Sequence, residues 1–406
     1  MNILFLSLPD IKNINERGLY QDLIREFIKN GHCVHVVSAV ERRKGEKTNL
    51  IEEHNYKLLR VKTGNIQKSS FIEKGISTML VGHQFLNAII KFFPNIIFDL
   101  IIYPTPPITF GATVSNIKKS SNAKCYLLLK DIFPQGAVDL GVLSEKSLIC
   151  KYFRAKERKL YEITDFIGCM SQANVDYVLK HNSYLHPNKV EICPNCSTVT
   201  PTEPISPSSN SFTDYKKLFS IPEEPIVFIY GGNLGRPQCI DFVIDCLKQN
   251  INRDDVYFIM CGDGTDYYLL EEFIASQKPK NVKLIKGLPR DEYDKLKSAC
   301  DVGLIFLDYR FTIPNFPSRM LSYMENALPV FACTDTSSDI GQVIVDGGFG
   351  WWCESNNANN FTRTLEKIVL QKDEVKQKGQ RALEYLKQNY AASISAEIIL
   401  KHFTSM

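Results

Sequence analysis

Residues 226–238 read IVFIYGGNLGRPQ, and this stretch decides the fold class of the chain. The apolar run Ile226–Tyr230 predicts a strand, three glycines follow it, and a helical pattern begins near Ile240. Glycines permit close approach of the backbone, and a helix N-terminus presents free N–H groups, so such a turn can hold a phosphate. A tight turn without a ligand explains the glycines equally well, and Arg236 favours an anion.

Apolar runs and helical patterns alternate along the rest of the chain of 406 residues. Runs without polar alternation, separated by helices, are typical of a parallel sheet buried on both faces. The sequence therefore predicts two doubly wound α/β domains that face each other across a cleft. The expected strands are Ile3–Ser7, Cys33–Val37, Leu100–Tyr103, Cys125–Leu129, Phe166–Cys169 and Val190–Ile192, then Ile226–Tyr230, Val256–Met260, Val282–Ile285, Val302–Phe306 and Val330–Ala332.

A change of composition separates the two halves. Residues 200–210 read TPTEPISPSSN, with three prolines and three serines, which predicts a linker. We therefore place one domain at residues 1–205 and a second at residues 206–388, followed by a tail, residues 389–406. The pattern from Asp373 to Phe403 is that of an amphipathic helix.

The composition excludes several classes of protein. The formal net charge is +3, from 48 basic and 45 acidic side chains, which is too small to indicate a nucleic-acid partner. Most of the 12 cysteines lie in apolar runs, which indicates free thiols in a reducing compartment. The first nine residues predict no signal peptide, and no uncharged apolar run reaches 18 residues, so we expect a cytoplasmic protein.

Two more glycine turns follow predicted strands of the second domain. The first contains Gly262 and Gly264, and the second contains Gly287 and Leu288. On one parallel sheet these turns would share an edge with residues 231–235. Each turn alone is equally consistent with a plain connection.

Ser318 and Arg319 form another candidate anion site. Ser318 has the residue type of a helix N-cap, which places Arg319 in the first helical turn. A cation there is unfavourable against the helix dipole, unless an anion lies nearby. A solvated arginine is the alternative.

In the first domain, Asp131 directly follows the predicted strand Cys125–Leu129. An acid at the carboxyl end of a strand can be catalytic, or it can simply form a turn. The pair Cys193 and Cys196 has the CxxC spacing, but neither a second pair nor a histidine lies near it, so we predict no metal and no redox cofactor. The first strand lacks the GxGxxG pattern of dinucleotide enzymes.

Taken together, the motifs YGGNLGRPQ, CGDG, KGLPRDEY, PSRMLSYM…LPV, ICPN and KDIFPQGAVDLG resemble the group 1 family of retaining glycosyltransferases with the GT-B fold. Within that family they are similar to the WbuB-like branch, which acts in O-antigen, capsule and lipopolysaccharide synthesis. The resemblance covers essentially the whole chain. It implies that the last helix crosses back to the first domain.

The resemblance also implies a nucleotide-sugar donor in the second domain and an acceptor in the first. It places Arg319 at the donor diphosphate and Asp131 at the acceptor hydroxyl as catalytic residues. The implied donor-binding residues are Gly232, Asn233, Leu234, Gly235, Arg236, Gly262, Gly264, Gly287, Leu288, Ser318, Ser322 and Glu325. The reaction is expected to need no cofactor or metal, and we see no Asp-x-Asp motif.

The chain departs from the family at four positions. Asn233 and Gln238 stand where many members have an arginine and a lysine, and Pro314 and Ser322 stand where many have two glutamates. Glu325, one helical turn after Ser322, is a possible substitute for the second glutamate.

The expected reaction moves a sugar, with an N-acetylated amino sugar as one option, from a UDP-linked donor to a polyprenyl-diphosphate-linked saccharide. Because such an acceptor is linked to a lipid, we expect the protein to make peripheral contact with the inner face of the cytoplasmic membrane. Residues 68–93 mix lysines with apolar and aromatic residues, as an interfacial helix does, and an ordinary core helix explains them as well. Two alternatives stay open: a UDP-sugar 2-epimerase of the same architecture, and a non-catalytic nucleotide-sugar-binding subunit.

Overall fold

The computed structural model describes residues 1–66, 71–198 and 215–403. The chain forms two compact units. Unit 1 comprises Met1–Thr198 together with Ala392–Met406, and unit 2 comprises Val199–Ala391. The predicted linker, residues 200–210, and the predicted boundary after residue 205 lie outside the described residues.

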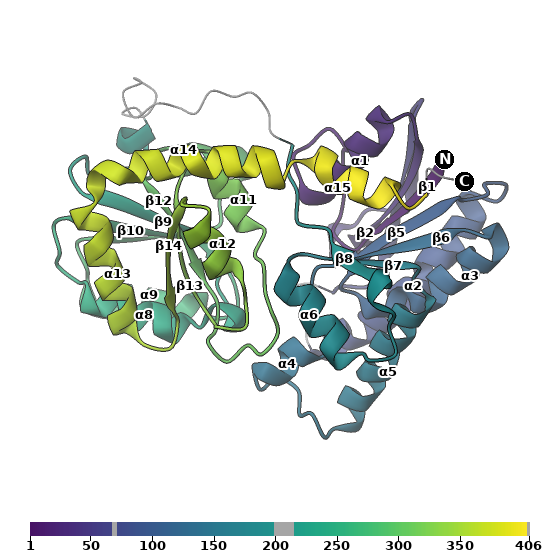
Figure 1. The fold of residues 1–406 in the computed structure, drawn as a ribbon, viewed down its shortest axis with the longest axis horizontal. Helices are drawn as coiled ribbons and strands as arrows, with labels where there is room; N and C mark the ends of the chain where they lie inside the picture. The colour runs from purple at the N-terminus through teal and green to yellow at the C-terminus, as the bar shows by residue number, and fades with distance from the viewer. Residues whose placement is uncertain (67–70, 199–214, 404–406) are drawn as a thin grey trace. The chain divides into compact units, whose positions relative to one another are not determined.

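Unit 1 is built on an eight-stranded sheet in the order β3-β4-β2-β1-β5-β6-β7-β8 (Figure 1). Ile3 pairs with Val34 of one neighbouring strand and with Leu100 of the other, so the order of the strands reverses at β1. Every pair is parallel except the edge pair of β3 and β4. The strands are β1 Asn2–Ser7, β2 Cys33–Glu41, β3 Asn49–Glu52, β4 Tyr56–Thr63, β5 Leu100–Thr105, β6 Lys124–Leu129, β7 Phe166–Cys169 and β8 Val190–Ile192.

Helices cover the sheet of unit 1. They are α1 Leu19–Lys29, α2 Phe71–Phe92, α3 Gly111–Ser121, α4 Gln135–Asp139, α5 Leu148–Ile163, α6 Gln172–His181 and α15 Ala392–Leu400. Helices α1 and α15 pack side by side (Figure 1), and their apolar residues share a core with β1 and β2. Glu191 anchors the C-terminal tail, because it accepts a 2.7 Å hydrogen bond from His402 and pairs with Lys401 at 2.7 Å.

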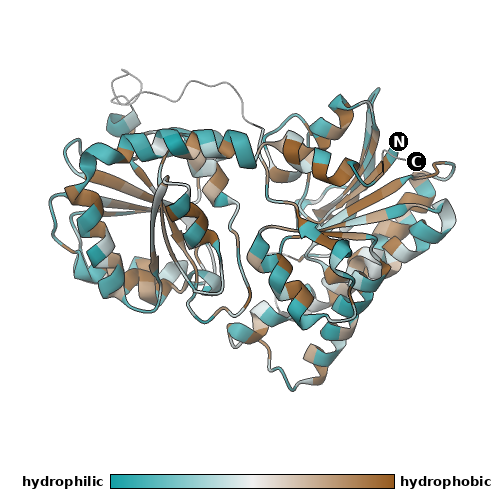
Figure 2. Cartoon of the chain, viewed as in Figure 1, coloured by the Kyte–Doolittle hydropathy of each residue, from teal (hydrophilic) through white to brown (hydrophobic). Residues whose placement is uncertain are grey.

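Unit 2 is built on a six-stranded parallel sheet in the order β11-β10-β9-β12-β13-β14. The strands are β9 Ile226–Asn233, β10 Val256–Asp263, β11 Val282–Lys286, β12 Val302–Phe306, β13 Val330–Thr334 and β14 Gly350–Glu354. The helices are α8 Ile240–Gln249, α9 Tyr267–Gln277, α10 Arg290–Ser298, α11 Arg319–Met324, α12 Ile340–Asp346, α13 Ala358–Leu370 and α14 Lys372–Asn389. The strands of both units are largely apolar, whereas the helices alternate polar and apolar residues (Figure 2).

The prediction of two doubly wound α/β domains is confirmed, and all eleven predicted strands are present. Strands β3, β4 and β14 were not predicted. The predicted helix over residues 373–403 is interrupted at Tyr390 and Ala391, where α14 of unit 2 ends and α15 of unit 1 follows. All twelve cysteines are free thiols, and no described helix is long and apolar enough to cross a membrane.

Candidate active site

The carboxyl edge of the unit 2 sheet gathers the predicted glycine turns. Strands β9 and β12 are neighbours here, and the strand order reverses between them, which is where ligands bind in doubly wound sheets. Gly262 is required by close packing, because a Cβ there would lie 1.9 Å from the carbonyl oxygen of Gly232. Gly264 is required likewise, because its Cβ would lie 2.2 Å from the carbonyl oxygen of Leu234. These two glycines therefore bring β10 against the end of β9.

The turn after β9 differs from the prediction. Strand β9 extends to Asn233, residues Arg236–Gln238 form a 3-10 turn, and α8 begins only at Ile240. The predicted start of the helix near Ile240 is confirmed, but a longer strand and a 3-10 turn precede it. A side-chain cap holds this turn: Gln238 Oε1 accepts from the backbone N–H of Gly235 at 3.3 Å and from Asn233 Nδ2 at 2.8 Å.

Two further amides of this turn already have partners. The N–H of Gly231 donates to the Tyr323 hydroxyl at 3.1 Å, and the N–H of Leu234 donates to the carbonyl oxygen of Asp263 at 3.0 Å. The Leu234 side chain is fully buried in the core. The backbone of the turn is thus committed largely to its own structure, and the positive charge at this edge has to come from side chains.

Arg319 supplies that charge. Its guanidinium lies over the ring of Tyr230, with Cζ 4.4 Å from the ring centroid. Its Nη2 is 3.2 Å from the position that a Cβ on Gly232 would take, and Gly232 has φ +133°, which favours glycine. Its Nη1 is buried and has no hydrogen-bond partner among the described residues. A permanently charged donor that is buried without a partner is costly, and a bound anion would satisfy it.

The residues around Arg319 contribute differently from the prediction. Ser318 stands at the N-cap position of α11 and Arg319 begins the helix, as predicted, but the Ser318 side chain makes no capping hydrogen bond to that helix. Ser318 has αR dihedrals, which turn its side chain away from the helix amides. The Ser318 hydroxyl and the Arg236 side chain are both exposed.

Ser322 is tied to a buried lysine that the sequence analysis did not single out. The ammonium of Lys297 donates to Ser322 Oγ at 2.7 Å and to Asp294 Oδ1 at 2.9 Å. The Lys297 side chain is fully buried, and burial lowers its pKa, while the charges of Asp294 and Glu325 act in the opposite direction. Neither Lys297 nor Asp294 belongs to a recognisable motif, so only the packing of α10 on α11 reveals them.

Gly287 and Leu288 follow β11, at the same edge of the sheet. Gly287 is exposed, and a Cβ on it would meet only the Cβ of Asp263, at 3.9 Å. Packing therefore does not require glycine here. The exposed backbone of this turn is accessible to a planar ligand group.

In unit 1, Asp131 lies just beyond the carboxyl end of β6. Its backbone carbonyl accepts a 3.1 Å hydrogen bond from the Thr105 hydroxyl. Burial raises the pKa of the Asp131 carboxyl to about 6, against a hydrogen bond from the Ile132 backbone. A second buried acid, Glu157 of α5, was missed by the sequence analysis, and burial raises its pKa to about 7. Raised carboxyl pKa values of this size suit proton transfer near neutral pH.

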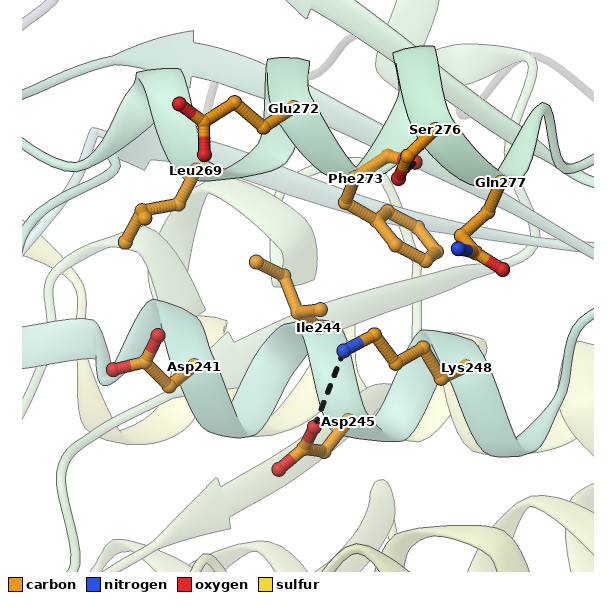
Figure 3. Close-up of a pocket in the computed structure, with 9 residues that line it drawn as sticks. All are labelled: Asp241, Ile244, Asp245, Lys248, Leu269, Glu272, Phe273, Ser276 and Gln277. Carbon is orange, nitrogen blue, oxygen red and sulfur yellow. Dashed lines mark hydrogen bonds and ion pairs between the residues drawn. The ribbon is translucent and has the colours of Figure 1, made fainter.

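A hollow of about 440 Å³ lies elsewhere in unit 2, between α8 and α9 (Figure 3). The acids Asp241, Asp245 and Glu272 stand around it, and Lys248 pairs with Asp245 at 3.9 Å. It contains none of the predicted donor-binding residues. Within the described ranges, no group of three or more His, Cys, Asp or Glu is arranged to hold a metal ion.

A comparison with family models identifies the domain that carries this edge. Residues 211–385 match the family described as glycosyl transferases group 1. The protein is a glycosyltransferase. Its two Rossmann-like units have the GT-B architecture that the sequence analysis predicted. The finer assignment to a WbuB-like branch stays a prediction.

Individual relatives agree with this assignment. The glycosyltransferase is 23 % identical over 301 residues to the probable glycosyltransferase WbjE of Pseudomonas aeruginosa, which covers 74 % of this chain and 72 % of the relative. Among solved structures, sucrose-phosphate synthase from Thermosynechococcus elongatus matches with a TM-score of 0.76 at 14 % identity, over 100 % of this chain and 98 % of that one. Anabaena HepE in complex with UDP matches with a TM-score of 0.69 at 14 % identity, over the whole of both chains.

Proposed function

We propose that this glycosyltransferase is a retaining enzyme that takes its sugar from a UDP-linked donor bound at the carboxyl edge of the unit 2 sheet. The observation that carries the proposal is the buried Nη1 of Arg319, which lies beside Gly232 and has no hydrogen-bond partner within the part of the chain that the structure describes. A donor diphosphate would supply the missing acceptor. The unsatisfied Nη1 of Arg319 would then donate to the group that becomes more negative during transfer.

The chemistry follows from that charge. When the bond between the anomeric carbon and the diphosphate oxygen breaks, its electron pair stays on the leaving nucleoside diphosphate. A guanidinium already fixed over Tyr230 stabilises this developing charge without reorganisation. The acceptor hydroxyl forms the new bond to the anomeric carbon and loses its proton. Asp131, with its pKa of about 6, is the residue of unit 1 that we assign to orient that hydroxyl or accept the proton.

UDP is the nucleotide that we favour for the donor. HepE, a structural neighbour, has been solved with UDP and with UDP-glucose. The exposed backbone at Gly287 suits the edge of a base. The neighbours also include a sucrose-phosphate synthase, so the fold alone does not select the sugar or the acceptor.

For the acceptor we propose a polyprenyl-diphosphate-linked saccharide in the synthesis of a bacterial surface polysaccharide. Support comes from the motif resemblance to the WbuB-like branch and from the similarity to WbjE along most of the chain. The same comparisons match glycosyltransferases, which favours transfer over the epimerase and the non-catalytic alternatives.

Calorimetric titration with UDP and GDP, with and without magnesium, tests the donor site. We expect UDP to bind and Arg319→Ala to weaken it by at least about tenfold, because an ion pair with a phosphate is lost. Arg363→Ala, which removes an exposed arginine of α13, is the matched control. Equal binding by Arg319→Ala and the control would remove the basis of the proposal.

A further inference from the structure

Helix α2 of unit 1 has apolar side chains on both sides. Val81 and Phe85 are fully buried beneath it, as a core helix requires. On the opposite side, Ile76, Met79 and Leu80 are 57 %, 40 % and 48 % exposed. The solvent face of a surface helix is normally polar. The apolar side chains on this face of α2 therefore indicate a site that contacts another protein or a membrane.

The beginning of α5 continues the same surface. Leu148, Ile149 and Tyr152 are 81 %, 56 % and 39 % exposed. The Tyr152 hydroxyl donates to Met79 Sδ at 3.5 Å, which joins the two helices. We call the six residues the unit 1 apolar patch: Ile76, Met79, Leu80, Leu148, Ile149 and Tyr152.

Basic residues outnumber acids around this patch. Residues 73–80 and 142–157 contain five basic side chains and three acids, a formal net charge of +2. One of these acids, the buried Glu157, pairs with Arg154 at 3.6 Å. Another, Glu73, pairs with Arg42 at 2.9 Å. Lys146 and Lys151 are exposed, and Lys156 Nζ lies 5.3 Å from the centroid of the Tyr152 ring. The patch therefore combines apolar side chains with a positive margin.

We propose that the unit 1 apolar patch docks the glycosyltransferase onto an anionic lipid bilayer. Apolar side chains of this size enter the boundary between headgroups and acyl chains, while lysines reach the anionic headgroups. The proposal rests on the proposed function, because a lipid-linked acceptor is presented at such a surface. It deepens that function by naming the residues that make the contact, and half of them belong to α5, outside the stretch at residues 68–93.

A second copy of this chain is the principal alternative occupant. A two-fold contact through this patch would bring its positive margin against the same margin of the other copy, which is unfavourable. Lysine is also depleted from the centres of protein interfaces. The charge therefore favours a negatively charged surface over a copy of the chain.

Co-sedimentation of the full chain with vesicles tests the proposal. The vesicles are pure phosphatidylcholine, or phosphatidylcholine mixed with phosphatidylglycerol. We expect binding to the mixed vesicles, and at least about tenfold weaker binding by the triple variant Ile76→Ser, Leu148→Ser, Ile149→Ser. The matched control Leu218→Ser, Leu370→Ser removes two exposed leucines of unit 2 and should bind as the unaltered chain does.

A charge pair of variants tests the lipid chemistry. The double variant Lys146→Gln, Lys151→Gln should bind the mixed vesicles more weakly, by about fivefold for each lysine removed. Added salt should also weaken the binding of the unaltered chain. Lys376→Gln, Lys387→Gln on the exposed face of α14 is the control and should have no effect. The proposal would be overturned if the unaltered chain bound neutral and mixed vesicles equally well. It would also be overturned if the Lys146/Lys151 variant and the Lys376/Lys387 control lost the same amount of binding.

Two measurements separate this proposal from its alternatives. Sedimentation velocity without lipid would overturn it if the unaltered chain is a dimer and the triple variant a monomer. UDP titration of the triple variant should match that of the unaltered chain, because the patch belongs to unit 1. If the unaltered chain binds vesicles but not UDP, the donor site is contradicted and the docking surface is supported. If it binds UDP but not vesicles, the docking surface is contradicted and the donor site is supported.

Discussion

The hydroxyl of Tyr293 occupies the space into which a side chain at position 231 would project: a Cβ on Gly231 would lie 1.8 Å from it. Tyr293 belongs to α10, and Gly231 to the end of β9. Gly231 does not have a positive φ, so contact alone requires glycine here. The ring of Tyr293 thus packs the helix that carries Lys297 against the strand that carries Gly232, beside which the Arg319 guanidinium lies.

Gly231→Ala is expected to destabilise unit 2 by about 1–3 kcal/mol, because the ring of Tyr293 has to move within a packed region. Urea denaturation monitors the effect. Tyr293→Ala removes the obstructing ring, so the double variant should lose less stability than the sum of the single variants. Additive losses would show that the two residues do not compete for space.

Ser322→Ala leaves one donor position of the buried Lys297 ammonium without its acceptor. We expect a loss of about 1–3 kcal/mol in the free energy of unfolding, measured in urea, because the remaining bond to Asp294 does not replace the missing one. Ser276→Ala on the exposed face of α9 removes a comparable hydroxyl and should change stability little. A similar small change in both variants would mean that Ser322 does not hold the lysine.

Periodicity predicted the fold well where strands are uniformly apolar. Strands β1, β5, β9 and β12 are buried on both faces, so their sequences are unbroken apolar runs. Of the missed strands, β3 and β14 lie at sheet edges, and β4 lies between β3 and β2. Strand β4 includes Arg60, whose guanidinium pairs with Asp10 at 2.9 Å. Because of such a charged residue, the sequence of a buried strand looks like that of a polar segment.

The candidate site was only partly predictable, for a related reason. Arg319 stood out because a cation in a first helical turn needs an explanation. Lys297 and Glu157 did not, because a lysine or glutamate within a helical pattern looks like a solvated side chain. Their burial results from packing between helices that are distant in sequence, such as α10 against α11, and single-sequence patterns do not carry that information.

The pKa of Asp131 predicts the pH dependence of transfer. If Asp131 accepts the acceptor's proton, kcat/KM should fall below a midpoint near pH 6, as the carboxyl becomes protonated. Asp131→Asn should lower kcat by a factor of about 10²–10⁴ and leave the affinity for UDP unchanged. Asp176→Asn on α6 is the control. A rate independent of pH between 5 and 8 would exclude this role.

Glu157 predicts a pH dependence of stability in unit 1. Burial raises its pKa from 4.5 to about 7 in the folded protein, although Arg154 and the Tyr161 hydroxyl act in the opposite direction. Between these two values the folded state binds more protons than the unfolded state, so stability falls as the pH rises. The full difference is about 3 kcal/mol and is reached above pH 7.

Glu157→Gln removes this titration and keeps an oxygen that can accept from Tyr161, whose hydroxyl lies 3.1 Å from Glu157 Oε1. The variant should therefore unfold at a higher temperature than the unaltered chain at pH 8, and the difference should shrink or reverse at pH 5. Glu162→Gln, which removes an exposed partner of Arg158 in the same helix, is the control. If the unfolding temperatures of both variants change with pH in the same way as that of the unaltered chain, then Glu157 is ionised in the folded protein already at pH 5.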